Sequence, residues 1–239
     1  MSATTSPTTL AELSARVGSL ESRLAALERV SVVSGSRPRA RRSSGSDAPA
    51  SALEGIGWTT RYVPVVLDVP ESWIDMHEHS ARPQLQRLIR DVVEGEGPIT
   101  DRLALDRVRR AWGLKRAGGR VQEAFDQALR QLVSRGLIER AGDALIIPGS
   151  EFDRVRVPGD DESTKRVAED VPLVELATAI GRAAEELSGG DENDLTMQVA
   201  QLFGWTRRGA SIQERLDAAL ARAVHDGLVR RADGRVDPV

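Results

Sequence analysis

Apolar residues recur at heptad spacing near the start of the chain, as Leu10, Leu13, Val17, Leu20, Leu24 and Leu27. Alternating steps of three and four are the period of a left-handed coiled coil. Thr8 or Thr9 can cap this helix, with Glu12 placed to complete a capping box. We therefore expect residues 1–30 to hold an oligomerisation helix that makes a homo-oligomer through residues 10–27. An amphipathic helix docking on its own protein is the alternative.

Periodicity is lost after this helix. Residues 31–57 are rich in Ser, Gly, Pro, Ala and Arg, which predicts a flexible linker with a short basic patch at Arg39, Arg41 and Arg42. The patch is either a solubilising stretch or an arm that touches phosphates. Residues 58–79 then show short apolar runs broken by Pro64 and Pro70, which predict extended segments lying against the domain that follows.

The rest of the chain contains an internal duplication. A shift of 91 residues aligns 112–141 with 203–232 without a gap, and 13 of these 30 positions are identical. We therefore expect two related domains, a first at 58–148 that includes the extended segment and a second at 173–239. An acidic, polar spacer at 149–172 joins them.

Each copy reads as three helices and a hairpin, the order of a winged helix. In the first copy we expect helices at about Pro83–Val93, from Thr100 or Asp101 to Trp112, and at Gly119–Ser134, then a hairpin. In the second we expect helices near 173–187, 194–203 and 211–225. Its hairpin is expected to be frayed or completed by a partner, because Asp237 and Pro238 follow where the first copy has Ile146 and Ile147. The fold class is mainly α, within α+β.

Glycines shared by the copies mark the turns. Gly113 is expected to end its helix in a left-handed conformation, and Gly136 and Gly227 are expected to cap theirs. Gly118 and Gly209 are expected to permit a positive φ in the turn before the third helix.

The turn motif resembles a known bacterial family. Both WGLKRAGGRVQEAF, which starts at Trp112, and FGWTRRGASIQERL, which starts at Phe203, fit Gly-x-Lys/Thr-Arg-x-Gly-x-x-Ile, apart from Val121 at the last position of the first copy. Residues 80–239 thus resemble the paired C-terminal module, of unknown function, of large superfamily-one helicase-like proteins. The resemblance implies association with nucleic-acid transactions and a helicase or nuclease partner. No Walker A loop occurs in the sequence, so ATPase activity is not implied.

The candidate nucleic-acid-binding residues are the basic side chains around these turns and in the linker: Lys115, Arg116, Arg120, Arg130, Arg207, Arg208, Arg39, Arg41 and Arg42. The shared carboxylates Glu123/Glu214 and Asp126/Asp217 would repel phosphates. They can instead pair with Arg116/Arg207 or Arg140/Arg231 and hold the turn or the hairpin in place.

Charge separates the two copies. Residues 84–148 carry 12 Lys and Arg against 9 Asp and Glu, whereas residues 173–239 carry 8 against 11. The basic first copy favours a DNA-binding oligomer, and the acidic second copy favours a protein–protein adaptor; we expect the former.

Several classes of chemistry find no support in the sequence. The chain has no cysteine, which excludes thiolate metal sites and disulfides, and we expect no metal, no cofactor and no enzymatic activity. Neither a secretory signal nor a run long enough to span a bilayer is visible. We expect no contact with membrane and a cytoplasmic location, with association with the nucleoid as an alternative.

Overall fold

The computed structural model describes residues 56–68, 74–207 and 209–239. All of these residues belong to one compact unit within Ala48–Val239. The predicted oligomerisation helix at 10–27, the basic patch at Arg39, Arg41 and Arg42, and Arg208 fall outside the described residues. No helix in the described part is long and apolar enough to cross a membrane.

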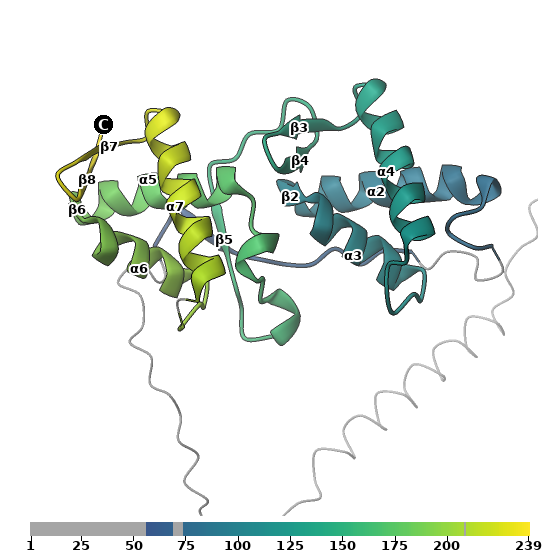
Figure 1. The fold of residues 1–239 in the computed structure, drawn as a ribbon, viewed down its shortest axis with the longest axis horizontal. Coiled ribbons are helices and arrows are strands. Elements are labelled where there is room, and N and C mark those ends of the chain that lie inside the picture. Colours follow the sequence, from purple (N-terminus) through teal and green to yellow (C-terminus); the bar gives the residue numbers. More distant parts are fainter. Residues whose placement is uncertain (1–55, 69–73, 208) are drawn as a thin grey trace, which may run out of the picture. The chain divides into compact units, whose positions relative to one another are not determined.

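The first repeat contains the expected three helices and hairpin (Figure 1). Its elements are α2 Arg82–Glu96, β2 Ile99–Thr100, α3 Asp101–Ala111, α4 Gly119–Ser134, β3 Glu139–Ala141 and β4 Ala144–Ile146. A short 3-10 helix, η1 His79–Ala81, leads into α2. The two residues of β2 pair antiparallel with β4, so the sheet has three strands in the order β2-β4-β3. One apolar face of each helix closes over this small sheet, and Phe125 and Leu129 of α4 are fully buried there.

The second repeat has the same elements in the same order. They are α5 Leu173–Leu187, β6 Gly190–Asp191, α6 Glu192–Leu202, α7 Ala210–His225, β7 Val229–Ala232 and β8 Arg235–Pro238, with strand order β6-β8-β7. The expectation of a frayed last hairpin was wrong, because β7 and β8 pair over four residues. Val236 stands at the position of Leu145 in the first copy, and both side chains are completely buried. Val236 anchors β8 in the second core, where Val229 of β7 is also buried.

Local side chains explain where the helices begin. The Thr100 side chain accepts a hydrogen bond from the Leu103 backbone N–H at the start of α3 (3.3 Å). At the start of α6, Asp191 accepts hydrogen bonds from the N–H groups of Asn193 (2.8 Å) and Asp194 (3.3 Å). These caps satisfy donors that have no partner inside the helix.

The shared glycines divide into two kinds. Gly113 and Gly136 have φ of +74° and +67° and end their helices in the left-handed conformation, as expected. The expectation for Gly118 and Gly209 was wrong: their φ values are −76° and −73°, with extended ψ. Both are the N-cap of the helix that follows, a position that requires extended rather than left-handed backbone.

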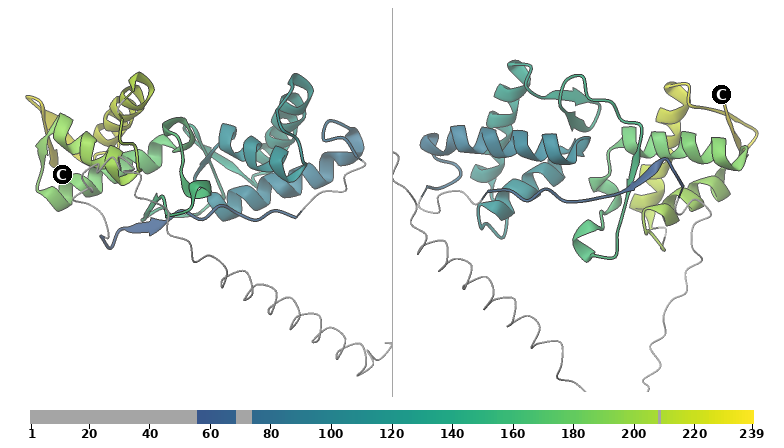
Figure 2. Two further views of the ribbon diagram at one scale, coloured as in Figure 1. Left: turned by 90° about the horizontal axis from the view of Figure 1, so that it is seen from below. Right: turned by 180° about the vertical axis from the view of Figure 1, so that it is seen from behind.

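The segment before the first repeat contacts both repeats. Tyr62 is buried in the first core, as expected, but Ile56 and Trp58 pack against the core of the second repeat. Between them, β1 Thr59–Arg61 pairs in parallel with β5 Val155–Val157 of the spacer. Figures 1 and 2 show this segment running from beside the second repeat to the first. This two-stranded sheet packs against the second repeat, and the chain continues from it to Tyr62 in the first core.

The spacer is more than a polar connection. It contains β5 and two 3-10 helices, η2 Glu162–Thr164 and η3 Ala168–Asp170. Val155, Ala168 and Val171 are buried in the second core. Burial of these apolar side chains fixes the spacer to the second repeat.

A buried carboxylate, Glu175 in α5, lies between two arginines of the spacer. Arg156 Nη2 donates to Glu175 Oε2 at 2.6 Å and Arg166 Nη1 donates to the same oxygen at 2.8 Å. Arg156 also donates to the backbone carbonyl oxygens of Glu96, Gly97 (3.3 Å) and Pro98 (2.6 Å), at the end of α2. A single guanidinium therefore joins the first helix of each repeat.

A second polar cluster lies on the first-repeat side of this junction. Tyr62 donates to Glu96, and Arg107 donates to Glu96 (2.9 Å) and to the Tyr62 hydroxyl (2.9 Å). Burial and the neighbouring Glu96 carboxylate raise the pKa of Tyr62 to about 12, so its hydroxyl stays protonated and can donate. The Arg166 guanidinium lies 4.2 Å from the centre of the Tyr62 ring, which links the two clusters.

Glu175→Gln tests the junction. Removing one charge of a buried ion pair leaves two buried guanidinium groups without a counter-ion, so we expect the free energy of unfolding to fall by about 3–5 kcal/mol. Urea unfolding followed by circular dichroism measures it. Glu185→Gln is the control, since Glu185 pairs with Arg182 on the surface, and we expect it to change stability by under about 1 kcal/mol. Equal effects of the two changes would contradict this role of Glu175.

The same carboxylate predicts a pH dependence. Although burial alone would raise it, the pKa of Glu175 is lowered from 4.5 because Arg166 and Arg156 stabilise the charged form. The resulting stability is present at pH values above about 4.5 and is lost as pH falls through the depressed pKa of the folded state. We expect acid to destabilise the wild type more than Glu175→Gln in thermal unfolding between pH 7 and pH 3. Parallel pH profiles would contradict the prediction.

Candidate nucleic-acid interface

The turn between α3 and α4 is held to α3 by Arg109. Its Nη1 donates to the backbone carbonyl oxygens of Leu114 (2.9 Å) and Lys115 (2.8 Å), and its Nη2 donates to Asp106. Only 17% of the Arg109 side chain is exposed. The turn backbone is thus fixed by a guanidinium from the preceding helix, a role that the sequence pattern does not reveal.

The turn and the exposed face of α4 present unpaired cations. Lys115, Arg116, Arg120 and Arg130 are all exposed, and within the described part of the chain their side chains form no ion pair or hydrogen bond. Many other arginines of this protein are paired, as Arg90 is with Glu94 on α2. Side chains that make no internal contact are available to a ligand at little cost to the fold.

The arginines shared by the two hairpins have a structural role. Arg140 binds Asp101 at the start of α3 (2.7 Å), and Arg231, its counterpart, binds Glu192 at the start of α6 (2.6 Å). The expectation that these arginines hold the hairpin is confirmed. Their partners were wrongly predicted, because the acidic residues that they reach are those at the helix starts.

Two of the four carboxylates expected as those partners bind glutamine side chains instead. Asp126 accepts a hydrogen bond from Gln122 (2.9 Å), and Asp217 accepts one from Gln213 (2.7 Å), so each contact stays within one helix. Arg116 has no ion pair with any described residue, contrary to the expectation that it is held by a shared carboxylate. The first turns of α4 therefore keep acidic side chains beside the basic turn.

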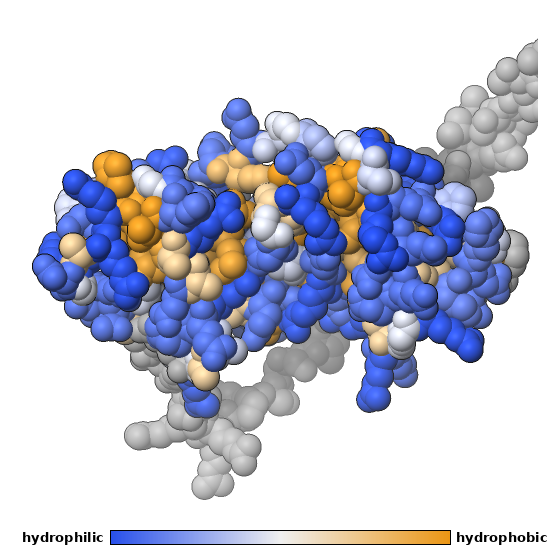
Figure 3. All heavy atoms as spheres, turned by 45° about the horizontal axis from the view of Figure 1, so that its top comes forward, coloured by the Kyte–Doolittle hydropathy of each residue, from blue (hydrophilic) through white to orange (hydrophobic). Residues whose placement is uncertain are grey.

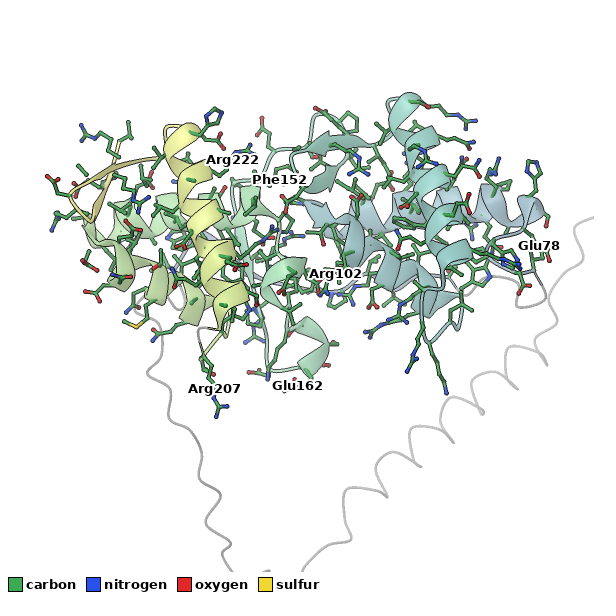
Figure 4. All side chains as sticks on the ribbon, in the orientation of Figure 1. Glu78, Arg102, Phe152, Glu162, Arg207 and Arg222 are labelled. Atoms are coloured by element: carbon green, nitrogen blue, oxygen red, sulfur yellow. The ribbon has the colours of Figure 1, made fainter. Side chains whose placement is uncertain are left out.

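The corresponding turn of the second repeat also has two basic residues, Arg207 and Arg208, but at shifted positions. Thr206 replaces Lys115, and Ser211 replaces Arg120. Arg207 is exposed and has no ion pair with any described residue; Figure 4 shows it pointing away from the body of the repeat.

The start of α7 is engaged by the first repeat. Arg215 binds Asp143, in the β3–β4 turn, and the backbone carbonyl oxygen of Val171 (2.6 Å). Asp143 also accepts a hydrogen bond from the Leu173 backbone N–H (3.0 Å). The β3–β4 hairpin of the first repeat thereby covers part of the helix that corresponds to α4. This contact too was not foreseen, because Asp143 and Arg215 are 72 residues apart.

A small polar hollow of about 270 Å³ lies beside Arg120. Glu78 and Glu123 line it together with Arg120 and Arg82, and Glu78 is marked in Figure 4. Among the described residues no group of three or more His, Asp or Glu side chains is placed to hold a metal ion. Arg120 thus lies in a hollow that two carboxylates also line, whereas Lys115 and Arg116 do not line it.

Comparison with known proteins gives one partial match. A family model described as a protein of unknown function (DUF3320) matches residues 75–123, which include α2, α3, the turn and the start of α4. No curated protein and no solved structure matches the chain.

Arg109→Ala tests how the turn is built. The change leaves two carbonyl oxygens without their donor and removes one of the two arginines that pair with Asp106, so we expect a loss of about 1–3 kcal/mol in unfolding free energy. Arg116→Ala is the control, and we expect it to stay within about 0.5 kcal/mol of the wild type because its side chain has no partner among the described residues. Chemical denaturation measures both, and a larger loss for Arg116→Ala than for Arg109→Ala would refute the assignment.

Proposed function

We propose that this chain is a non-enzymatic, nucleic-acid-binding protein built from two winged-helix domains. Two observations support the winged-helix assignment of both repeats. Each repeat has the order helix, strand, helix, helix, hairpin, and in each the first short strand joins the hairpin to make a three-stranded sheet. In this fold α4 and α7 occupy the position of the recognition helix.

The observation that carries the proposal is the group of unpaired cations on the first repeat. Lys115 and Arg116 project from the turn that precedes the recognition helix, and Arg120 and Arg130 follow on that helix. Phosphate groups attract such side chains, and the turn itself is rigid because Arg109 fixes its backbone.

The acidic residues of α4 define the kind of binding that we propose. Glu123 and Asp126 occupy the first turns of the helix, where base-reading residues usually lie, and carboxylates there repel phosphates. We therefore propose that phosphate contacts dominate binding and that sequence preference is weak.

The second repeat contributes less to this binding. Its only unpaired cation among the described residues of the turn is Arg207. Oligomerisation through residues 10–27 would place several first repeats on one nucleic acid and so add avidity to weak individual contacts. The basic residues Arg39, Arg41, Arg42 and Arg208 remain proposed phosphate contacts.

A protein–protein adaptor is the second candidate, and a surface of the second repeat favours it. Phe152, Gly181, Leu228 and Val239 line a hollow of about 320 Å³ beside the last hairpin. Val239 is 77% exposed, and Figure 3 shows apolar side chains gathered over this repeat. Exposed apolar patches often mark interaction sites. A helicase or nuclease as the partner rests on the sequence resemblance alone.

Lys115→Ala/Arg116→Ala/Arg120→Ala tests the proposed function. We expect at least a tenfold loss of affinity for DNA in fluorescence anisotropy at low salt. The slope of log affinity against log salt should flatten by about one for each phosphate that the variant no longer neutralises.

The matched control is Arg90→Ala/Arg182→Ala/Arg235→Ala, which removes the same charge. These three arginines pair with exposed carboxylates away from the turn. We expect it to bind DNA within about twofold of the wild type. Absence of binding by the wild type at low salt, or equal losses in the two triple variants, would overturn the proposed function.

A further inference from the structure

A hollow of about 420 Å³ lies between α3 and the spacer, next to the basic turn. Arg102 and Arg110 of α3 line one side, and Lys165 and Val167 of the spacer line the other. Figure 4 marks Arg102 in this region between the repeats. The spacer that joins the repeats therefore also forms one wall of a concave surface.

The hollow is positively charged, and three of its four cations are accessible. Arg102, Arg109, Arg110 and Lys165 line it against two carboxylates, Asp106 and Asp170. Exposed fractions of the side chains are 61% for Arg102, 65% for Arg110 and 55% for Lys165.

Carboxylates already pair with these cations, and they differ in exposure: the Asp106 side chain is 22% exposed and that of Asp170, which binds Arg102, is 15% exposed. Arg110 binds Asp106 (2.7 Å), and Lys165 binds Glu162, whose side chain is 85% exposed. Ion pairs between exposed groups contribute little to stability. A phosphate oxygen can therefore replace Glu162 at Lys165 without loss of the fold, and it can accept from the exposed Arg110 beside Asp106.

Apolar side chains lie in the same hollow. Leu105, Ala117 and Val167 line it, and Val167 is 51% exposed. An apolar floor with cations at the rim suits a ligand that carries phosphates on one side and a sugar or base on the other. A duplex keeps its bases stacked inside and offers mainly phosphates, whereas an unpaired strand exposes both kinds of group.

The hollow continues the proposed binding surface. Ala117 follows Arg116 directly in the chain, so the hollow begins where the exposed turn ends. A strand held at Lys115 and Arg116 reaches the hollow without leaving the protein surface. No aromatic residue is among the described residues that line the hollow, so the contact lacks a stacking platform and is indifferent to sequence.

We propose that this hollow holds one unpaired strand of nucleic acid, with Arg110 and Lys165 on its phosphates and Val167 against a sugar or base. The proposal rests on the proposed function and narrows its ligand from nucleic acid in general to an unpaired strand. Phosphodiester chemistry is common to DNA and RNA, so the test includes both.

The experiment compares Arg110→Ala/Lys165→Ala with Arg90→Ala/Arg182→Ala in the full chain. The probes are a labelled DNA strand, an RNA strand of the same sequence and the matching DNA duplex, each titrated at several salt concentrations. The hollow variant should lose at least tenfold in affinity for the DNA or RNA strand that the wild type binds more tightly. Its salt slope should flatten by about 1.4, which is two phosphates at about 0.7 each. The control should change affinity by at most about twofold.

A change in the opposite direction provides a second test. Glu162→Gln removes an exposed carboxylate that competes for Lys165, so we expect about a twofold gain in affinity for the strand at low salt. Thermal unfolding of each variant shows whether the fold is kept, and we expect melting temperatures close to that of the wild type.

The outcomes separate this proposal from the one on which it rests. If the triple change at Lys115, Arg116 and Arg120 abolishes binding but the hollow variant behaves like its control, the hollow is not a binding site. If the hollow variant loses affinity for the duplex and for the strand equally, the hollow has no preference for an unpaired strand, and that part of the proposal is overturned. If the triple change has no effect, the proposed function itself fails.

Discussion

The buried Glu175 carboxylate, held between Arg156 and Arg166, is the contact on which the arrangement of the two repeats depends. Arg156 also reaches the backbone carbonyl oxygens at the end of α2, and Arg166 lies over the ring of Tyr62. Trp205 in turn donates to the Arg166 backbone carbonyl oxygen (2.8 Å). Charges buried in this way are costly unless fully paired, so the geometry around Glu175 is closely defined.

The junction around Glu175 holds two repeats that have the same scaffold but different surface residues. Both copies keep the ion pair that holds the hairpin, Arg140 with Asp101 and Arg231 with Glu192. They differ around the turn: Thr206 and Ser211 of the second copy stand where the first has Lys115 and Arg120, and Arg207 is its one unpaired cation among the described residues of the turn. The β3–β4 hairpin also covers part of α7 through Asp143. The duplication has thus kept the scaffold and changed its surface, which is why we assign nucleic-acid contact to the first repeat.

Local sequence patterns predicted most of the repeat architecture. The apolar stripe of α4 and the capping residue Thr100 indicated helix positions close to those observed, because they depend on neighbours within a few residues. The conformation of Gly118 was wrongly predicted, since a glycine before a helix fits either a left-handed turn or an extended N-cap. Exposed cations of the turn could be named from the sequence, but whether carboxylates neutralise them could not.

Contacts between residues far apart in the chain could not be predicted from the sequence pattern. Tyr62 and Glu96 are 34 residues apart, and Arg156 and Glu96 are 60 apart. A single sequence offers no periodicity that pairs such positions. The spacer looked polar because its buried residues, Val155 and Ala168 among them, are spread among charged ones. Both the junction and the hollow beside Val167 follow from these long-range contacts.

Hydrogen exchange tests whether the first repeat is the one that contacts nucleic acid. The full chain is measured with and without a bound nucleic-acid strand. We expect slowed exchange in the turn 113–118 and in the spacer around Lys165. The equivalent turn at 204–207 should show little change. Protection centred on the last hairpin, near Leu228 and Val239, or equal protection of the two turns, would contradict it.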